Sequence, residues 1–379
     1  MKHTFVPFAV IMLLIQSHFS FAQPRSTGSR KYVIMGYIGS KNWTKEDILA
    51  TKMTHIIYAF ANLTANGVLA PASVKDSTNL VILNTTKQEN KALKILISVG
   101  GWGGCKYFSD ASLTAESRAK FITSALAFIK KFKLDGIDID WEYPAQIGAG
   151  NIYRPEDKQN FTLLMKEFRA ALDEQAALDH HQNYLLTAAT GVDSAYMKNT
   201  DVGSVQKYLD YINLMTYDIY NGNDKVTGHQ SNLYQSKYGH QVRVSAADAI
   251  ENYIKAGVPA NKIVMGLPFY GRGWTMVNDE DRGLYQPSGG HHFSLSYDSL
   301  ENAYINKNGF DRFWDKKAKV PYLWNSKTHT FITYADERSF KYKARYVKEH
   351  NLAGVMFWEY TLDLKKQGLF NPLYHFIND

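Results

Sequence analysis

The sequence predicts an α/β fold, a (β/α)8 barrel of the TIM type with a small α+β insertion domain between strands 7 and 8. Short runs rich in β-branched and aromatic residues alternate with longer segments of helical period over nearly the whole chain. Eight such runs can be counted. The interval between the last two is too long for one crossover helix, so an inserted unit is expected there.

The eight expected strands are spaced along the chain as strand–helix units. In order they are residues 32–37, 55–61, 94–100, 136–143, 185–190, 211–217, 263–269 and 354–360. In a barrel of this type, the side chains that perform chemistry lie at the carboxyl ends of the strands. We therefore expect a functional site among the last residues of these runs.

Two of the expected helices carry clear signals. The segment 161–172 places apolar residues at helical spacing and so forms one apolar face. A second helix is predicted to begin at Ser245, because Asp248 three residues later completes a pattern like a capping box. Gly257 is expected to end that helix.

The long interval after the seventh run sets the expected domain boundaries. Residues 273–335 are rich in Gly, His, Tyr and Trp in short alternating patches, which favours a small α+β insertion over a structureless loop. The barrel would then consist of residues 30–272 and 336–379. Residues 1–22 are expected to be a signal peptide.

The first residues have the pattern of an export signal. Lys2 and His3 precede an apolar stretch over 5–15 and a small-residue cleavage site at 20–22. That stretch is too short to span a bilayer, and we expect a secreted or periplasmic protein without a membrane partner. Cys105 is the only cysteine, whereas secreted eukaryotic enzymes of this size usually carry several, so a bacterial origin is favoured.

Composition argues against several other classes of function. The formal net charge is +7, but the basic residues are scattered among acids, and no nucleic-acid partner is expected. The histidine pairs at 180–181 and 291–292 lack companion ligands, so no metal site is expected. The run GGWGG at 100–104 lacks the Lys-Ser/Thr of a phosphate loop. We expect a monomer without a cofactor.

The most informative run is DGIDIDWEYP, residues 135–144. Strand alternation sends Asp138, Asp140 and Glu142 to one face and apolar residues to the other. The apolar face suits the helix layer, so the acids point into the barrel. Three carboxylates in such an interior cannot all ionise cheaply, and at least one should keep a proton near neutral pH. Glu142 lies nearest the carboxyl end and is the expected general acid.

The acid row has two other possible interpretations. Acids on a strand can face solvent, but apolar residues bracket these acids on a central strand. A row of acids can also bind a divalent cation. This second interpretation stays open, although no histidine accompanies the acids and one strand offers a straight row rather than a cage.

The same run resembles the DxxDxDxE signature of glycoside hydrolase family 18, matched at Asp135, Asp138, Asp140 and Glu142. Four other runs are similar to the family's motifs on strands 3, 6, 7 and 8, namely SVGGW (98–102), NLMTYD (213–218), LPFYGRGW (267–274) and GVMFWEY (354–360). The resemblance covers almost all of residues 32–370. It implies hydrolysis of β-1,4 bonds between N-acetylglucosamine units of chitin and chitooligosaccharides.

The resemblance also implies a substrate-assisted retaining mechanism, in which the substrate's own acetamido carbonyl attacks the anomeric carbon. Glu142 would protonate the glycosidic oxygen and later act as the base. Asp140 would orient the acetamido N–H, and Asp138 would share a proton with Asp140, helped by Ser98 and Tyr37. Asp135, at the start of the strand, is expected to be structural.

Further site residues follow from the other motifs. Tyr217 would be the fourth catalytic residue and would donate to the acetamido carbonyl, while Asp218 would hold a sugar hydroxyl. Trp358 would form the floor of the cleavage subsite, where an aromatic face can stack on a pyranose ring. The remaining expected substrate contacts are Trp102, Met215 and Arg272.

A chitinase is the favoured function, because the insertion resembles one that deepens the groove in one chitinase subgroup and would line the substrate cleft. An endo-β-N-acetylglucosaminidase that acts on N-glycan cores shares the strand-4 signature and is the alternative within the class. A non-catalytic chitin-binding lectin is the alternative from another class. Such lectins typically lack the terminal acid, which is present here as Glu142.

Overall fold

The computed structural model describes residue 1 and residues 32–41, 43–180, 183–239 and 243–379. Residues 2–22 of the predicted signal peptide, and His181, therefore lie outside the described residues. The division of the chain into residues 30–272 with 336–379 and residues 273–335 stays a prediction. No helix in the described part of the chain has the length and apolarity needed to span a bilayer.

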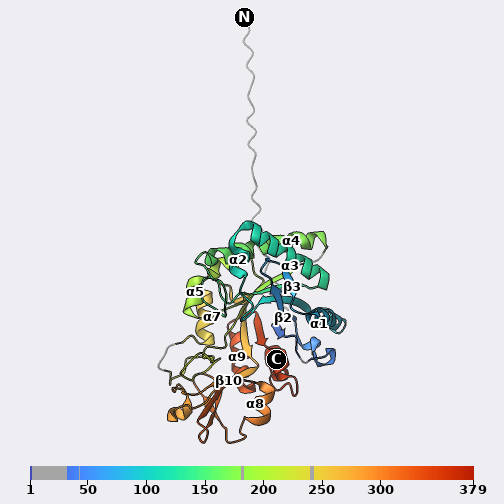
Figure 1. Ribbon diagram of the computed structural model, residues 1–379. Coiled ribbons are helices and arrows are strands. Elements are labelled where there is room, and N and C mark those ends of the chain that lie inside the picture. The colour runs from blue at the N-terminus through green and yellow to red at the C-terminus, as the bar shows by residue number, and fades with distance from the viewer. Residues whose placement is uncertain (2–31, 42, 181–182, 240–242) are drawn as a thin grey trace. The chain divides into compact units, whose positions relative to one another are not determined.

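In the described residues, eight parallel strands close into a barrel, which confirms the predicted fold (Figure 1). Around the barrel the order is β1, β14, β8, β7, β6, β5, β4 and β2, and β2 pairs back with β1. The strands are β1 Val33–Ile38, β2 His55–Leu63, β4 Lys94–Gly100, β5 Gly136–Asp140, β6 Leu185–Thr190, β7 Tyr211–Leu214, β8 Ile263–Pro268 and β14 Gly354–Trp358. A short strand, β3 Leu69–Pro71, adds to β2 in the antiparallel sense.

Helices cover the barrel strands and connect them (Figure 1). They are α1 Val74–Thr85, α2 Phe108–Leu113, α3 Ala115–Phe132, α4 Asp157–Leu178, α5 Ser194–Asn199, α6 Val202–Val205, α7 Ala246–Lys255, α9 Glu337–Glu349 and α10 Phe370–Asn378. Short 3-10 turns lie at Lys45–Asp47, Ala50–Lys52, Thr86–Gln88, Ala260–Lys262, Glu280–Gly283 and Tyr360–Asp363.

Both sequence-based helix predictions are confirmed. The apolar face predicted over 161–172 lies in α4 and is buried against the barrel. Ser245 caps α7, accepting a hydrogen bond from the backbone N–H of Asp248, and the Asp248 side chain completes the capping box. Gly257 follows that helix with a φ of 93°, a left-handed conformation that suits a residue without a Cβ.

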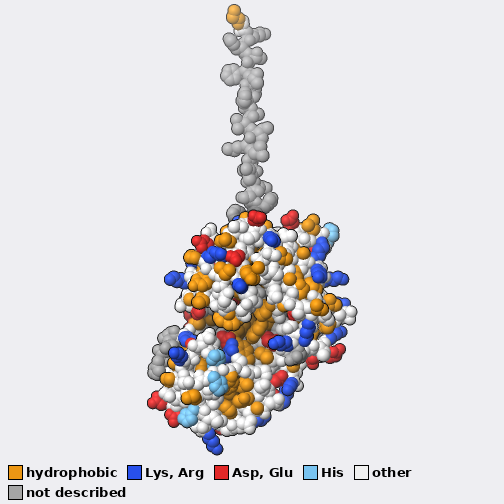
Figure 2. Space-filling model, in the orientation of Figure 1, with side chains coloured by type: hydrophobic (Ala, Val, Ile, Leu, Met, Phe, Trp, Pro, Cys, Tyr) orange, Lys and Arg blue, Asp and Glu red, His pale blue; other side chains and the backbone are white. Residues whose placement is uncertain are grey.

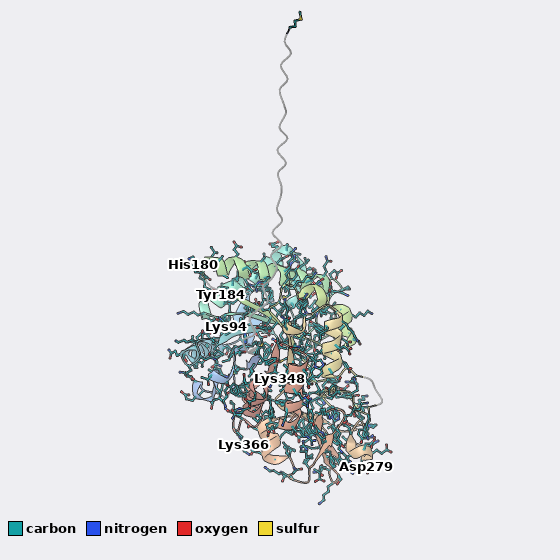
Figure 3. All side chains as sticks on the ribbon, turned by 180° about the vertical axis from the view of Figure 1, so that it is seen from behind. Lys94, His180, Tyr184, Asp279, Lys348 and Lys366 are labelled. Carbon is teal, nitrogen blue, oxygen red and sulfur yellow. The ribbon has the colours of Figure 1, made fainter. Side chains whose placement is uncertain are left out.

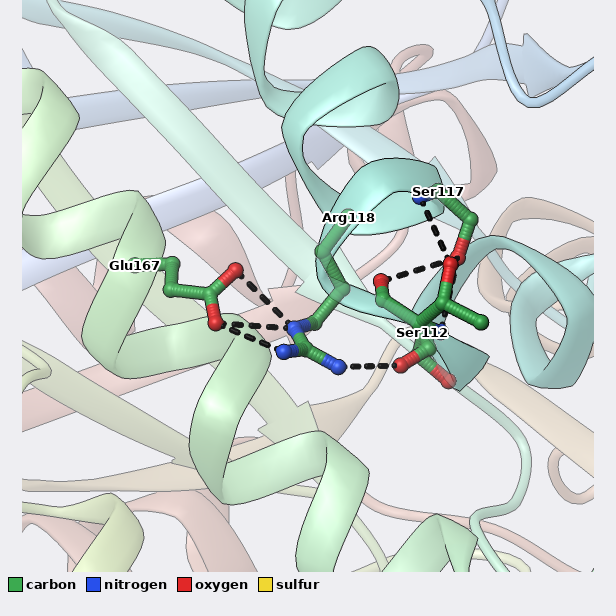
Figure 4. Close-up of polar contacts among 5 residues, drawn as sticks. Ser112, Ser117, Arg118 and Glu167 are labelled. Carbon is green, nitrogen blue, oxygen red and sulfur yellow. Dashed lines mark hydrogen bonds and ion pairs between the residues drawn. The ribbon is translucent and has the colours of Figure 1, made fainter.

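The two helices on either side of the acid-bearing strand are tied together by Arg118 of α3 (Figure 4). Its Nε and Nη2 donate to the Glu167 carboxylate of α4 at 2.8–2.9 Å, and its Nη1 donates to the carbonyl of Ser112 at 2.9 Å. The Arg118 side chain is buried and that of Glu167 is 34% exposed, so solvent screens this bidentate ion pair in part. It fixes α4, the helix that follows β5, to the end of α2.

A second, antiparallel sheet of five strands lies between β8 and β14 in the sequence and confirms the predicted α+β insertion. Its order is β10, β9, β13, β12, β11. Its elements are β9 Tyr270–Trp274, β10 His292–Ser296, α8 Tyr297–Ala303, β11 Asp311–Asp315, β12 Val320–Asn325 and β13 Thr330–Thr333. Only Phe269 separates β8 from β9, so the small sheet grows directly from the carboxyl end of a barrel strand. Figure 2 shows the surface hollowed between the barrel and this sheet, with hydrophobic side chains in the hollow.

The fourth barrel strand is shorter than predicted, ending at Asp140 rather than at residue 143. Its last register pair is Asp140 with Gly100 of β4. Gly100 has a φ of 111°, which turns β4 away and leaves the next residues of β5 without a ladder partner. Glu142 therefore lies two residues beyond the strand, in the loop that follows it.

The amino-terminal end of the barrel is closed by polar contacts around Asp135. Lys94 and Tyr184, labelled in Figure 3, lie at the start of β4 and just before β6. Asp135 accepts a hydrogen bond from the backbone N–H of Ile95 at 2.8 Å and pairs with Lys87 at 2.5 Å and Lys94 at 3.6 Å. This placement, at the opposite end of β5 from Glu142, agrees with the structural role expected for Asp135.

Lys343 of α9 is an unusual buried cation. Its side chain is fully buried, and its Nζ has no hydrogen-bond partner in the described part of the chain. Burial lowers the pKa of Lys343 from its ordinary value to about 7, opposed in part by the charge of Asp336. The folded protein therefore holds a neutral amine in its core above neutral pH.

We predict that Lys343→Met raises the free energy of unfolding at pH 7 by roughly 2–4 kcal/mol, because the unfolded chain binds a proton that the folded chain holds weakly. In the wild type, stability should rise with pH between about 7 and 10, and this slope should be smaller in the variant. Urea unfolding at several pH values measures both effects. Lys341→Met, at an exposed position of the same helix, is the control, and an equal gain there would contradict the prediction.

Candidate active site

The acids of β5 form a row that leads from the barrel interior to its mouth. Exposure rises from 0% at Asp138 through 5% at Asp140 to 9% at Glu142, which gives their order of depth. Trp141, between the last two, points the other way and stacks on Phe108 at a centroid distance of 5.3 Å. The alternation predicted from the sequence is therefore confirmed, with the acids inward and the apolar side chains against the helices.

Asp138 is surrounded by hydrogen-bond donors from four other strands. Tyr37 of β1 and Ser98 of β4 donate to Oδ2, at 3.0 and 2.7 Å. Thr187 of β6 and Asn213 of β7 donate to Oδ1, at 2.6 and 3.3 Å. Burial raises the pKa of Asp138, and these four donors act in the opposite direction. The predicted contacts with Tyr37 and Ser98 are present, and two further donors accompany them.

Asp140 is in the opposite situation. Its Oδ1 has no hydrogen-bond partner among the described residues. Burial raises the pKa of Asp140 well above its ordinary value, and the charges of Glu142 and Asp138 raise it further. Burial and negatively charged neighbours both favour the neutral form of this carboxyl. In the part of the chain that the structure describes, no group of three His, Cys, Asp or Glu side chains is arranged to hold a metal ion.

Glu142 has the properties of a general acid that works near neutral pH. Burial raises its pKa to about 7. The hydroxyl of Tyr143 and the backbone N–H of Trp102 hydrogen-bond to its carboxyl group and lower the pKa, whereas the charge of Asp218 raises it. An acid with such a pKa is about half protonated at neutral pH and can both give up and take back a proton there.

The loop after β4 also holds the backbone of Glu142. The backbone N–H of Glu142 donates to Sγ of Cys105 at 3.1 Å, and the Cys105 thiol lies 3.1 Å from the carbonyl oxygen of Asp140. The backbone N–H of Gly101 donates to the same carbonyl at 2.8 Å. A Cβ on Gly100 would lie 2.0 Å from that oxygen, so this close approach requires a glycine. The single cysteine therefore fixes the backbone on both sides of Trp141.

The residues predicted from the sixth expected strand, which is β7 in the structure, lie beside the acid row. Tyr217 and Met215 follow β7 and pack with Met356 of β14 in the barrel interior. The Tyr217 hydroxyl lies 3.9 Å from Sδ of Met356, a weak acceptor. Burial and the charges of Asp140 and Glu142 raise the pKa of Tyr217 well above its ordinary value. Its hydroxyl keeps its proton and can donate it in a hydrogen bond.

Asp218 and Arg272, predicted separately, form one ion pair. Arg272 of β9 donates from Nε and Nη2 to the two carboxylate oxygens of Asp218, at 2.8 and 2.7 Å. Its Nη1 donates to Ser294 of β10 at 2.6 Å. The guanidinium also lies over the ring of Tyr270, 4.9 Å from its centroid. The small antiparallel sheet, through β9, therefore contributes a positive charge beside the acid row.

Two predicted tryptophans lie in different surroundings. Trp358, at the end of β14, stacks on Phe60 at 5.5 Å and meets Tyr37 at 5.8 Å, so its ring is fixed within the barrel mouth. Phe60 in turn packs on Gly101, where a Cβ would lie 2.4 Å from the ring. Trp102 is 61% exposed and lies 6.5 Å from the ring of Tyr143, so it stands at the rim rather than in the buried site.

The geometry can be compared with known proteins. The model of the glycosyl hydrolases family 18 matches residues 33–363, which include every residue of the site. The chain belongs to glycoside hydrolase family 18. It is 35% identical to chitinase A1 of Niallia circulans over 96% of this chain, and it spans 61% of that relative's length. It is 34% identical to chitotriosidase-1 of Mus musculus, over 84% of this chain and 68% of the relative.

A solved structure described as a family 18 N-acetylglucosaminidase from Paenibacillus barengoltzii superposes with a TM-score of 0.85. The two share 42% sequence identity, and the match covers 91% of this chain and all of that one. The protein is thus a family 18 glycosidase with relatives that carry more than one activity in their names.

Sequence reasoning missed several residues of this family 18 site. Thr187 and Asn213 are polar residues at inward positions of central barrel strands, and the alternation used for the acids could have found them. Tyr143 directly follows Glu142 in the signature run, but its contact with the acid depends on the turn after β5. Nothing in the sequence indicates that Cys105 meets the Glu142 backbone, because that contact crosses from one loop to another.

We predict that Cys105→Ala lowers the free energy of unfolding by about 1–3 kcal/mol, because it leaves the buried N–H of Glu142 without an acceptor. Cys105→Ser should lose less unfolding free energy, since a hydroxyl can accept from the backbone N–H of Glu142 and donate to the carbonyl of Asp140. Chemical denaturation of both variants provides the comparison. An equal loss of unfolding free energy in the two variants would show that packing of the thiol stabilises the protein, and that its hydrogen bonds do not.

Proposed function

We propose that this protein hydrolyses β-1,4 bonds between N-acetylglucosamine units in chitin and chitooligosaccharides. The observation that carries the proposal is the row Asp138, Asp140 and Glu142, in which the acid at the mouth lies above a buried carboxyl, Asp140, whose pKa burial raises well above its ordinary value. Asp140 is buried on the same face as Glu142 and is not placed across a scissile bond from it. A neutral neighbour is a poor nucleophile, so the attacking group must come from the substrate.

The 2-acetamido group of N-acetylglucosamine supplies such a nucleophile. Glu142 protonates the glycosidic oxygen while the acetamido carbonyl oxygen attacks the anomeric carbon, which gives an oxazolinium ion and releases the leaving sugar. Water then opens the oxazolinium, with Glu142 acting as base. Two inversions at the anomeric carbon retain its β configuration.

Other residues would hold the reacting sugar. Tyr217 donates to the acetamido carbonyl, Met215 packs beneath that group, and Asp140 orients the acetamido N–H. Trp358 presents an aromatic face at the barrel mouth on which a pyranose ring can stack. The fixed ring of Trp358 limits the entropy lost when the sugar binds.

The rim residues would contact sugars on either side of the cleaved bond. Trp102 offers an exposed aromatic face, and Asp218 with Arg272 offers a polar pair that can bind hydroxyl groups. Relatives named chitinase A1 and chitotriosidase-1 support a chitin-type polymer as the substrate. We also propose that the protein is exported, on the sequence pattern of residues 1–22, and that its origin is bacterial, on its single cysteine.

Glu142→Gln should lower turnover of a fluorogenic chitotrioside by about 10²–10⁴-fold while binding of the oligosaccharide persists, because only the proton donor is lost. In the wild type, kcat/KM should fall above pH 7, where Glu142 loses its proton. A pH–rate profile together with binding calorimetry of the variant measures both. Wild-type turnover in Glu142→Gln would refute the assignment.

The solved relative described as an N-acetylglucosaminidase makes single-sugar release an alternative to cleavage within the chain. Products from a labelled chitin hexamer distinguish the two, because internal cleavage yields a ladder and terminal cleavage yields monosaccharide first. We expect the ladder, since residues at the rim extend beyond the cleavage subsite. The first products should be β-anomers by NMR, and an initial α-anomer would exclude the substrate-assisted mechanism.

Analysis of the products released from a high-mannose glycoprotein tests the endo-β-N-acetylglucosaminidase alternative. Glycan release without release of chitooligosaccharides from colloidal chitin would overturn the chitinase proposal. Binding of chitin without any cleavage by the wild type would favour the lectin alternative. The presence of Glu142, with its pKa raised to about 7, argues against a lectin.

A further inference from the structure

The four donors around Asp138 fill its acceptor positions. A carboxylate has about four lone-pair positions, two on each oxygen. Thr187 and Asn213 occupy Oδ1, and Ser98 and Tyr37 occupy Oδ2. All five side chains are buried, so no water competes for these positions from the surface. A proton on Asp138 would have to displace one of these donors.

Asn213 determines the direction of part of this network. Its amide nitrogen lies 3.3 Å from Oδ1 of Asp138 and 3.0 Å from the Tyr37 hydroxyl, so it can give one hydrogen to each. The Tyr37 oxygen then accepts from Asn213 and directs its own proton to Asp138. Thr187 makes the shortest of the four bonds, at 2.6 Å, in the range of a hydroxyl that donates to a charged oxygen.

We propose that Thr187 and Asn213 are positioning residues of the acid row, which together with Ser98 and Tyr37 hold Asp138 as an anion and so keep the single proton of the pair on Asp140. The contrast between the two carboxyls carries this inference. Asp138 receives four donors, whereas Oδ1 of Asp140 receives none from the described residues. The inference rests on the proposed function for its catalytic consequence, but the position of the proton can be measured without a substrate.

The position of the proton matters for Glu142. A neutral Asp140 puts no second negative charge beside Glu142, and its O–H can donate to the Glu142 carboxylate after Glu142 has given its proton to the glycosidic oxygen. An ionised Asp140 would instead repel that carboxylate. Thr187 and Asn213 therefore act on the reaction through Asp138 and Asp140, without touching the substrate.

Few charged groups surround Asp138 and Asp140 that could change which of the two carboxyls holds the proton. The titratable side chains that face Asp138 and Asp140 are Glu142, Tyr37, Tyr217, Tyr143, Tyr196 and Cys105. Burial raises the pKa of each tyrosine and of the thiol, so all five are neutral where Glu142 titrates. Asp218 faces Glu142 and is paired with Arg272.

Thr187→Val removes one donor from Asp138 with little change of side-chain volume. Asp138 then takes the proton and Asp140 ionises, so that the pKa of Glu142 rises. We expect kcat to fall about 10- to 100-fold, the range of one hydrogen bond to a charged group, with a smaller change in KM. The alkaline limb of the kcat/KM profile should shift to higher pH. In Thr187→Ser, kcat and the alkaline limb of the profile should both return toward their wild-type values.

The proton itself can be followed by carbon NMR of the unliganded protein with labelled aspartate carboxyl groups. In the wild type the signal that disappears in Asp140→Asn should be that of a protonated acid, and in Thr187→Val the protonated signal should belong to Asp138. Asn213→Leu should act in the same direction as Thr187→Val if the latter folds poorly. Thr86→Val, which removes a buried hydroxyl that donates to the carbonyl of Leu83, is the control and should leave the pH profile unchanged.

Three results would overturn the inference. They are an unshifted pH profile in a folded Thr187→Val, a loss in Thr187→Ser equal to that in Thr187→Val, and an ionised Asp140 in the wild type. If the wild-type protein shows the expected carboxyl signals but cleaves no chitooligosaccharide, the proposed substrate is wrong and the inference about the position of the proton still holds.

Discussion

The buried negative charge of Asp138 is the constraint on which the rest of the site depends. A carboxylate deep in a protein costs several kcal/mol unless donors replace the lost water. The donors come from β1, β4, β6 and β7, so strands on both sides of β5 must be in register before the charge is compensated. The compensation is therefore a property of the closed barrel, and no single strand–helix unit could supply it.

Above this charge, the environment changes along β5 from the interior to the mouth. Asp140 is buried, and its Oδ1 has no hydrogen-bond partner among the described residues. Glu142 lies where Tyr143, the backbone of Trp102 and the charge of Asp218 act on its pKa. Arg272 limits the effect of Asp218, and it comes from β9, which starts directly after β8. The small antiparallel sheet thus takes part in the electrostatics of the acid row as well as bordering the hollow.

Much of this arrangement could be predicted from the sequence, because it depends on local periodicity. The alternation of Asp138, Asp140 and Glu142 with apolar residues gave their common face, and the spacing of the runs gave the barrel and the insertion. What the sequence did not indicate depends on contacts across loops. The end of β5 is set by the turn at Gly100, and the pairing of Asp218 with Arg272 is set by how the small sheet folds back.

Two fully buried ionisable side chains, Lys343 and Asp138, show two different responses to the loss of hydration. Lys343 has no hydrogen-bond partner among the described residues, and the folded state responds by lowering its pKa until the amine is neutral. Asp138 has four donors and can stay charged at the same degree of burial. A buried amine becomes neutral without any nearby hydrogen-bond partner. A buried carboxylate stays charged only if donors surround it, and here four strands must each place a donor at the correct register position. Such a concentration of polar residues in a barrel core is destabilising unless every group is paired, which is why the donors around Asp138 are better explained by chemistry than by stability.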